Sequence, residues 1–490
     1  MDYLSASHIA QAIRQGSLSA TDITQHYLSN IERYNSHLNA FVDVFSDRAV
    51  LQARQRDAVI KKTPDKAGPL HGVPVSVKEC FLMAGTRSSV NYPPLKKHVA
   101  ATTSMLVQRL ERAGAVILGK TNIPTLLSDA QTFGPLYPQC NNPHDLSRTP
   151  GGSTGGGAAA LAADMTSLEL GSDIGGSIRN PSAFCGLYGF KPTENGHCND
   201  GHVPPLPGST LGWSAMNSTG PLARRAGDLA LACKVLFAPD WVDQHYLPVA
   251  SPATPPTSLK GLNIGVLTSL YHLNPGSDVT AALSSLQQKL EQAGATVTPV
   301  HIDPELAKKL LLCWVSLFGY FMGQTLSWPI RKLFYLRFRG ALKDSSLDAR
   351  AAFKRGLAMD FKAFSRCLAE RQHLIGEIHR LYSPYDTVLS PTAMGPAFTH
   401  NHQHQRIALD GIDMPYIDYC FPFVALYNLT GMPVLTVPAG RNDSGLPVGL
   451  SFAAARHADD WLLAFGELLE QQGMTTPLTQ TPDALQAVNA

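Results

Sequence analysis

Apolar residues recur along the chain with two different spacings, which predict helices alternating with short buried strands. Ile23, Tyr27 and Ile31 lie four residues apart, which is typical of one face of a helix. Apolar runs such as 73–77 and 115–118 are too short for helices and predict buried strands. Further strands are predicted at 262–267, 296–300, 387–390, 434–437 and 448–452, and further helices at 7–13, 102–113, 279–292 and 461–471. This alternation predicts an α/β fold with a mixed sheet and helices on both faces.

Composition narrows the class of protein. The 490 residues include 40 Lys and Arg against 38 Asp and Glu, a net charge of +2, which argues against a nucleic-acid partner. The longest nearly apolar run, 310–322, is shorter than the ~20 residues that span a membrane, and we expect no leader at the N-terminus. Eight scattered cysteines without a Cys-x-x-Cys pair predict reduced thiols and a cytoplasmic protein. Without a repeat or a long linker, we expect residues 1–490 to form one domain.

Two glycine-rich segments, 150–160 and 171–181, each contain Gly-Gly-Ser. A Gly-Gly-Ser turn exposes a hydroxyl together with several backbone N–H groups, which are the nucleophile and the oxyanion donors that acyl transfer needs. The candidate serines are Ser153 and Ser177. A phosphate-binding loop is disfavoured because no Gly-Lys-Ser/Thr follows the glycines. A nucleophile elbow at 151–155 is disfavoured because a loop, not a strand, precedes it. Purely structural turns remain an alternative.

A hydroxyl nucleophile needs a base, and Lys78 is the candidate. It ends the apolar run 72–77, so its amine is expected to be buried. Burial favours the neutral amine and lowers the pKa of a lysine, whereas strand alternation should point Glu79 away from it. The alternative is an ordinary surface lysine with a buried stem.

Three motifs together resemble the amidase signature family. They are Gly-Val-Pro-Val-Ser-Val-Lys-Glu at 72–79, Gly-Gly-Ser-Thr-Gly-Gly at 151–156, and 171–179 with the Pro181, 184–186 and 191–193 that follow it. Segments 142–150, 431–433 and 445–450 are also similar to the family, so the resemblance covers nearly the whole chain, with the signature core at about 70–195. The resemblance implies the family's fold, in which the central twisted sheet is mixed but mostly parallel.

Carried over by position, the resemblance implies a Ser–cis-Ser–Lys triad. It makes Ser177 the nucleophile, Ser153 a bridging serine after a cis peptide bond, and Lys78 the base. Its remaining site residues are the backbone N–H groups of Ile174, Gly175, Gly176 and Ser177 as oxyanion hole, and Asp173, Arg179 and Thr154 as supports. Thr154 stands where the family usually has a second serine, and we expect its hydroxyl to keep that serine's hydrogen bond.

The resemblance implies hydrolysis of carboxylic amides at the C–N bond through an acyl-enzyme, without cofactor or metal, with esters and carbamates as further substrates. Its character is nearest to fatty-acid amide hydrolases and acylamide amidases, so the expected partner is a small amide with an apolar acyl or aryl group. A homodimer is compatible with this interpretation. One alternative is an amidotransferase subunit of the glutamyl-tRNA type; another, of a different class, is a lipid-binding protein of the membrane surface.

An aromatic and basic segment at about 305–375 is predicted to roof the substrate site. Trp314, Phe318 and Phe321 recur at helical spacing, and basic residues follow them. Such a helical pair can cover an apolar pocket, form ordinary core, or lie on a membrane.

Two histidine clusters could in principle ligate zinc. They are His400, His402 and His404, and the group His197, Cys198, Asp200 and His202. Because the resemblance supplies a metal-free mechanism, we expect no metal site.

Overall fold

The structure is a computed structural model that describes residues 3–196, 198–207, 215–237, 254–324, 326–343, 345–346 and 348–487. Its α-helices are α1 Ala6–Arg14, α2 Ala20–Leu38, α3 Ser46–Lys62, α4 Met105–Arg112, α5 Gly155–Ala162, α6 Arg179–Cys185, α7 Ala226–Leu236, α8 Ser277–Gln292, α9 Pro304–Gly323, α10 Trp328–Lys343, α11 Ala349–Leu357, α12 Phe361–Tyr382, α13 Tyr416–Cys420, α14 Pro422–Thr430, α15 Asp459–Gln471 and α16 Asp483–Ala487. Its strands are β1 Phe41–Val44, β2 Pro74–Lys78, β3 Val116–Thr121, β4 Leu168–Asp173, β5 Tyr188–Lys191, β6 Ser218–Ala223, β7 Asn263–Val266, β8 Thr296–Pro299, β9 Thr387–Pro391, β10 Ile407–Leu409, β11 Ile412–Met414, β12 Val434–Arg441 and β13 Pro447–Ala453.

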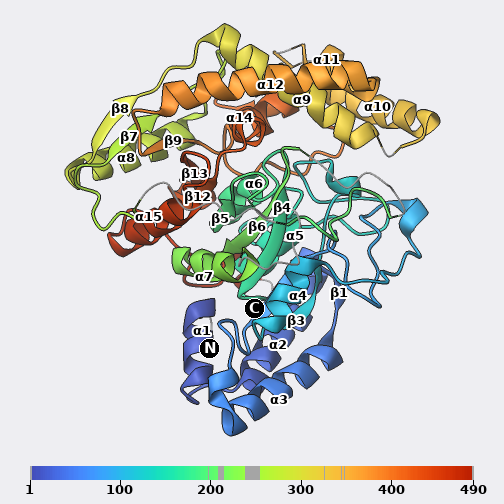
Figure 1. Cartoon of the computed structure of the whole chain (residues 1–490), viewed down its shortest axis with the longest axis vertical. Helices are drawn as coiled ribbons and strands as arrows, with labels where there is room; N and C mark the ends of the chain where they lie inside the picture. Colours follow the sequence, from blue (N-terminus) through green and yellow to red (C-terminus); the bar gives the residue numbers. More distant parts are fainter. Residues whose placement is uncertain are drawn as a thin grey trace.

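Within the described residues, one sheet of eleven strands runs through the molecule in the order β1-β3-β2-β4-β6-β5-β12-β13-β9-β7-β8. Figure 1 shows helices α9–α12 and α14 gathered at the top of the molecule and helices α1–α3 at the bottom. Strand β2 lies between β3 and β4, and every one of its residues is buried. The candidate base therefore stands at the end of an interior strand.

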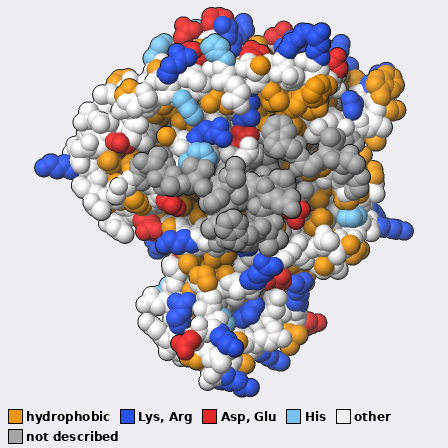
Figure 2. Space-filling model, in the orientation of Figure 1, with side chains coloured by type: hydrophobic (Ala, Val, Ile, Leu, Met, Phe, Trp, Pro, Cys, Tyr) orange, Lys and Arg blue, Asp and Glu red, His pale blue; other side chains and the backbone are white. Residues whose placement is uncertain are grey.

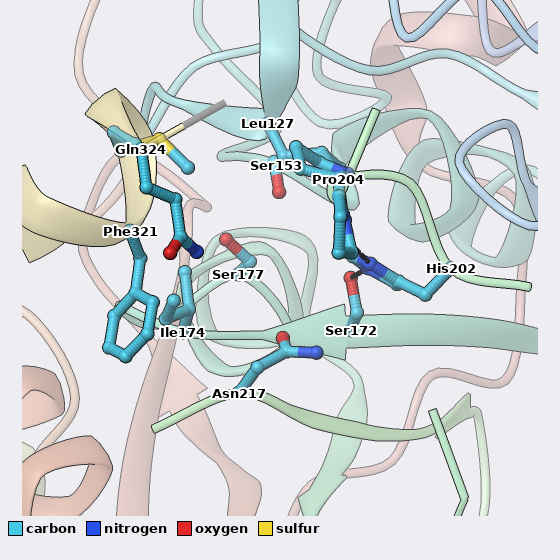
Figure 3. Close-up of a pocket in the computed structure, with 12 residues that line it drawn as sticks. Leu127, Ser153, Ser172, Ile174, Ser177, His202, Pro204, Asn217, Phe321 and Gln324 are labelled. Atoms are coloured by element: carbon cyan, nitrogen blue, oxygen red, sulfur yellow. Dashed lines mark hydrogen bonds between the residues drawn. The ribbon is translucent and has the colours of Figure 1, made fainter. Parts of the chain in front are cut away.

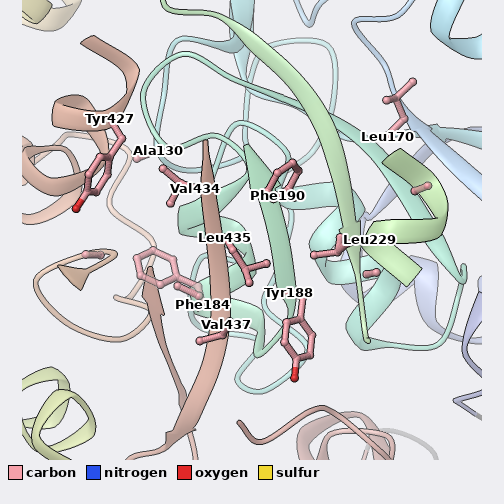
Figure 4. Packing of buried hydrophobic residues seen from close by; sticks show 14 of the residues in the cluster. Ala130, Leu170, Phe184, Tyr188, Phe190, Leu229, Tyr427, Val434, Leu435 and Val437 are labelled. Atoms are coloured by element: carbon pink, nitrogen blue, oxygen red, sulfur yellow. The ribbon is translucent and has the colours of Figure 1, made fainter. Parts of the chain in front are cut away.

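Helices cover both faces of this sheet. Leu435 of β12 packs against Gly466 of α15, whereas Gly189, which lies beside the next residue of β12, packs against Ser182 of α6. Because successive residues of a strand point to opposite faces, α15 and α6 lie on opposite sides. Figure 4 shows the aromatic and branched side chains of β5, β12 and α6 meeting in this core. The predicted α/β fold with helices on both faces is confirmed.

The parallel strands that the family resemblance implies occupy two parts of the sheet. β2 pairs parallel with β3 and β4, and β7 pairs parallel with β8 and β9. Between these groups β6, β5, β12 and β13 pair antiparallel with their neighbours. The turn between Arg441 and Pro447 is too short for the crossover that a parallel pair needs, so β12 and β13 form a hairpin. The sheet is mixed, and its middle is antiparallel.

Capping residues explain where the first helices begin. The Ser5 side chain accepts a hydrogen bond from the backbone N–H of His8 at the start of α1. Ser19 does the same for Thr21 and Asp22 at the start of α2. Asn39 ends α2 in the left-handed conformation that asparagine tolerates.

Helix α9 is the one described helix whose length and composition would allow it to cross a membrane, and 67% of its apolar window is buried against the rest of the chain. Such burial is typical of a core helix. The following helix, α10, exposes Trp328 (73%) and Leu333 (67%) beside basic residues. Figure 2 shows apolar and basic side chains interspersed over the part of the surface where Figure 1 places α10.

Candidate active site

Lys78 is the last residue of β2 and is completely buried. Its amine lies 2.9 Å from Ser153 Oγ, 3.1 Å from Ser172 Oγ and 3.2 Å from the Ser172 carbonyl oxygen. Burial lowers the pKa of Lys78 to about 8, although Cys80, Asp173 and Glu169 act in the opposite direction. A substantial part of this lysine is therefore neutral near pH 8, which is the state in which an amine can accept a proton.

Glu79 points away from the amine, as strand alternation predicted. Its carboxylate accepts hydrogen bonds from the backbone N–H groups of Ser89 and Val90 and from the hydroxyl of Tyr137. These donors hold Glu79 away from the Lys78 amine, so the Glu79 carboxylate does not raise the pKa of Lys78.

Ser153 lies at the start of α5, and the peptide bond between Gly152 and Ser153 is cis. A side chain at Gly152 would meet the backbone oxygens of Gln131 and Asp129 at 2.4 and 2.7 Å, so only glycine fits there. Gly151 has a φ of +89°, a conformation that glycine adopts without strain. The two glycines thus bring the Ser153 hydroxyl to the Lys78 amine.

The expectation for Thr154 was wrong. Its hydroxyl is buried and makes no hydrogen bond with any described residue. The side chain packs against the backbone of Gly171, where an added Cβ would meet Thr154 Cγ2 at 3.0 Å. The additional methyl of threonine thus occupies the space beside β4, and Thr154 contributes through its backbone, which donates to the Ser177 carbonyl oxygen at 3.1 Å.

Ser177 follows β4 in a turn that leads into α6. Gly176 adopts a φ of +92° in this turn, and Val424 leaves no room for a Cβ. Figure 3 shows the hydroxyls of Ser153 and Ser177 entering the same cavity, which both residues line. The structure thus brings Lys78, Ser153 and Ser177 together from three separate segments of the chain.

Asp173 and Arg179 form an ion pair with both side chains inaccessible to solvent. Two guanidinium nitrogens donate to the Asp173 carboxylate at 2.8 and 3.0 Å, and Asn428 donates to it at 3.0 Å. Burial alone would raise the pKa of Asp173, but the charge and hydrogen bonds of Arg179 hold it well below its usual range. The pair ties the two ends of the Ser177 turn together.

We expect Arg179→Ala to destabilise the protein by about 3–5 kcal/mol, because the change leaves a buried carboxylate without its counter-charge. The matched control is Arg380→Ala, which breaks the exposed pair of Arg380 with Glu377 and should cost about 1 kcal/mol or less. Urea denaturation followed by fluorescence measures both. Equal small losses in the two variants would contradict a supporting role for the buried pair.

The predicted oxyanion donors are not equivalent. The N–H of Gly176 donates to Asp173 at 2.8 Å, so it is already engaged with a carboxylate. A charged acceptor binds an N–H more strongly than a neutral one does. The Gly176 N–H is therefore excluded from the predicted oxyanion hole. Ile174, Gly175 and Ser177 remain as candidates. The Trp314 indole donates to the carbonyl oxygen of Ile174 at 3.0 Å and packs against Gly175.

The cavity around Ser177 has no charged side chain among its described lining residues. The residues that line it are Leu127, Ser153, Ser172, Ile174, Ser177, His202, Pro204, Pro205, Asn217, Phe321, Met322 and Gln324. Figure 3 shows the Gln324 amide pointing toward Ser177, and the Asn217 side chain on the side of Ser177 away from Ser153. The lining suits an uncharged ligand that offers hydrogen-bonding atoms.

A second, almost wholly apolar pocket lies behind Trp314. Helix α9 supplies Trp314, Val315 and Phe318 to its wall, and Phe353, Tyr416 and Phe421 add further aromatic rings. Ser128 and Asp129 are its polar lining residues. Trp314 stacks on Phe318 with ring centroids 5.0 Å apart. Helix α9 thus reaches both spaces, because Phe321 lines the first and Phe318 the second.

Four polar lining residues were not assigned to the site from the sequence. Ser172 lies within a motif that was recognised, and His202 was considered only as a metal ligand. Asn217 and Gln324 carry no local signal, because a single amide in a loop or at a helix end is common. Three-dimensional proximity alone places them beside Ser177.

The histidine clusters separate in the structure. His404 Nε2 lies 2.6 Å from Asp129, and the His402 ring stacks on Phe133 at 4.2 Å. In the other group His197 lies outside the described residues. Over the part of the chain that is described, no three His, Cys, Asp or Glu side chains converge as metal ligands would.

Comparison with known sequences identifies the family. The profile described as Amidase matches residues 22–463. The A subunit of glutamyl-tRNA(Gln) amidotransferase from Deinococcus radiodurans is 31% identical over 503 residues, which cover 96% of this chain and 98% of that protein. Its counterpart from Nitrosococcus oceani is 29% identical over 497 residues, with coverage of 96% and 98%.

Solved structures agree on the fold. A structure of an inhibitor-bound complex, described in connection with an s-triazine catabolic enzyme, matches with a TM-score of 0.81 at 26% identity, covering 97% of this chain and 100% of that one. A bacterial aryl acylamidase matches with 0.81 at 24% identity, covering 99% and 98%. Fatty acid amide hydrolase matches with 0.82 at 22% identity, covering 97% and 86%. The last two similarities establish the fold alone. Since the Amidase profile covers most of its length, the chain belongs to the amidase family, with the amidase signature motifs at its centre.

Proposed function

We propose that this protein is a serine amidohydrolase that cleaves the C–N bond of uncharged carboxylic amides with an apolar acyl or aryl group. One observation carries the proposal: the Lys78 amine, whose pKa is lowered to about 8, contacts Ser153 at 2.9 Å beside the cavity that holds Ser177. A buried neutral amine, a bridging hydroxyl and a second hydroxyl form a path along which a proton can leave the nucleophile.

In the proposed mechanism, Ser177 Oγ attacks the amide carbonyl carbon while its proton passes to Ser153 Oγ and the Ser153 proton passes to Lys78. The N–H groups of the 174–177 turn that do not bind Asp173 stabilise the oxyanion. The lysinium then returns its proton through Ser153 to the leaving nitrogen. The C–N bond breaks, the amine departs and an acyl-Ser177 ester remains. Water hydrolyses this ester by the same relay, which restores Ser177.

The lining of the cavity supports an uncharged substrate. A zwitterionic amino acid such as glutamine needs partners for its carboxylate and its ammonium group, because burying an unpaired charge is costly. None of the described residues that line the Ser177 cavity carries a charge. The neighbouring pocket is lined mainly by aromatic and aliphatic side chains, and its one described carboxylate, Asp129, is already bonded to His404 and Tyr416. These surroundings favour an amide whose acyl or aryl group extends from Ser177 toward α9.

An amidotransferase component is the second candidate. The observation that favours it is the identity of about 30% with the A subunit of glutamyl-tRNA(Gln) amidotransferase over nearly the whole of both chains. In that case the protein would release ammonia to a partner. Because the lining described above carries no charge, a charged residue of the complex, or one of this chain that moves into the cavity, would have to bind the substrate.

A substrate series separates the two candidates. We expect the purified protein to release aniline from neutral acyl anilides, with kcat/KM rising as the acyl chain lengthens toward the aromatic pocket, and to release little ammonia from L-glutamine. Absorbance of the free aniline and a coupled ammonia assay measure both reactions.

A variant of the cavity wall checks where the acyl group lies. Phe321→Ala should flatten the dependence on chain length, because Phe321 is the aromatic residue of α9 that lines the Ser177 cavity. Faster turnover of glutamine than of every anilide would favour the amidotransferase candidate. An equal loss for all chain lengths in the variant would show that α9 does not select the acyl group.

A further inference from the structure

His202 contacts the base through one intervening side chain. Its Nε2 lies 2.9 Å from Ser172 Oγ, and Ser172 Oγ lies 3.1 Å from the Lys78 amine. Figure 3 shows the contact between His202 and Ser172 at the wall of the Ser177 cavity. Neither residue belongs to the proposed triad, so this chain of contacts needs its own explanation.

The loop that carries His202 is fixed to the end of β2. Leu82 donates a backbone hydrogen bond to Gly201 at 2.8 Å, and Val203 donates one to Cys80 at 2.9 Å. The His202 ring packs edge-on against Phe81, with centroids 5.4 Å apart. These contacts hold the imidazole in one place relative to Lys78.

The partners of the ring determine its tautomer. Nδ1 lies 2.9 Å from the carbonyl oxygen of Pro204, which can only accept, so Nδ1 carries the hydrogen. Burial, with a further contribution from the Lys78 charge, lowers the pKa of His202 to about 4, so the ring is neutral above pH 6. Nε2 is then an acceptor, and the hydroxyl of Ser172 must donate to it.

The direction of the Ser172 hydroxyl decides how Lys78 is solvated. With its hydrogen given to His202, Ser172 Oγ can only accept from the Lys78 amine. A neutral amine has two N–H groups and one lone pair. Its two N–H groups are taken by the carbonyl oxygen and the Oγ of Ser172, at 3.2 and 3.1 Å. The lone pair is left for the third neighbour, Ser153 Oγ, at 2.9 Å.

We propose that His202 is a positioning residue for the base: it takes the Ser172 hydrogen, which directs the lone pair of neutral Lys78 at Ser153. The proposal rests on the proposed function, because it assigns His202 a part in the same proton relay. Without an acceptor at position 202, the Ser172 hydroxyl could turn and donate to the lone pair, in competition with Ser153.

A double-mutant cycle tests the proposal. The proteins are the unchanged chain, His202→Phe, Ser172→Ala and the double variant, with His202→Gln as the conservative change that keeps an acceptor for Ser172. We expect His202→Phe to lower kcat for a neutral anilide on the order of 10²-fold with little change in KM, as for a misdirected catalytic group. His202→Gln should restore most of that loss. In the Ser172→Ala background, His202→Phe should cause no further loss.

The pH dependence gives a second readout. The groups that face Lys78 are Cys80, Glu169, Asp173 and His202, and Ser172 and Ser153 complete its surroundings. Because the neutral amine gains an alternative donor in His202→Phe, the alkaline limb of kcat should move to lower pH or stay, while its plateau falls. Additive losses in the cycle, or a loss confined to KM, would overturn the proposal and make His202 a structural residue or a substrate contact.

A measurement on the resting protein separates this proposal from the proposed function. Carbon-13 NMR of histidine-labelled protein, with the His202→Gln variant to assign the signal, should show a neutral Nδ1–H tautomer that does not titrate between pH 5 and 9. If that tautomer is found and no amide is hydrolysed, the proposed function fails alone. If the ring titrates in this range or carries its hydrogen on Nε2, the positioning proposal fails whatever the substrate is.

Discussion

Ser177→Ala is expected to abolish labelling by a fluorophosphonate probe and to lower amide hydrolysis by at least about 10⁴-fold, because the change removes the atom that forms the acyl bond. Mass spectrometry of the labelled, unchanged protein should place the adduct on Ser177. The control is Ser182→Ala, a buried serine of the adjacent helix whose hydroxyl donates to the Ile178 carbonyl oxygen, and it should keep its labelling.

Ser153→Ala should behave differently. It removes the bridge between Ser177 and Lys78 but leaves the nucleophile, so slow labelling should persist while hydrolysis falls by about 10²–10⁴-fold. An adduct found on Ser153 instead would exchange the roles of the two serines and would bring back the nucleophile elbow that the loop before Gly151 disfavours.

Lys78→Ala is expected to remove the alkaline limb of the pH–rate profile. The neutral amine is the active form and its pKa is about 8, so in the unchanged protein the rate should fall about tenfold per pH unit below 7 and level off above 9. The variant should be slower by about 10²–10⁴-fold with a nearly flat profile.

Lys120→Ala is the matched control for the lysine. Lys120 is equally buried on the adjacent strand β3, and burial also lowers its pKa to about 8. Its amine donates to the Arg87 carbonyl oxygen and to the Ser88 hydroxyl and, within the described part of the chain, to neither Ser153 nor Ser177. Its removal should leave the position of the limb unchanged. Activated esters should lose less than amides in Lys78→Ala, because their leaving group needs no returned proton. A limb that survives in Lys78→Ala would make this lysine structural.

Much of the fold could be predicted from the sequence because apolar periodicity is strong where elements are regular. The strand ending at Lys78 and the helix carrying Ile23, Tyr27 and Ile31 lie where predicted. Strand β4, Leu168–Asp173, was not predicted, because Glu169, Gly171 and Ser172 interrupt its apolar pattern. Glu169 is tolerated in this interior strand because Ser76 and Thr121 donate to its carboxylate at 2.5 and 2.6 Å. Such pairing across strands leaves no trace in a local pattern.

The candidate site could be predicted from the sequence about as well as the fold. Lys78, Ser153 and Ser177 each stand in a glycine-rich or strand-end motif, and the structure places the three together. The donors of the Ser177 turn were not predicted correctly in detail, because the Gly176 N–H is claimed by Asp173 and only coordinates show which backbone group faces the cavity. The position of His202 depends on a loop distant in sequence, and no spacing rule connects it with Ser172.

The hydrogen bond from Trp314 to the Ile174 carbonyl oxygen has a mechanical consequence. The carbonyl of Ile174 and the N–H of Gly175 belong to one planar trans peptide unit, so the indole that holds the oxygen also sets the direction of the N–H. The same side chain also lines the aromatic pocket. A group that fills the pocket and shifts Trp314 would rotate the peptide plane and re-aim an oxyanion donor. The length of the substrate would then affect kcat as well as KM, because Trp314 couples the aromatic pocket to the Gly175 N–H.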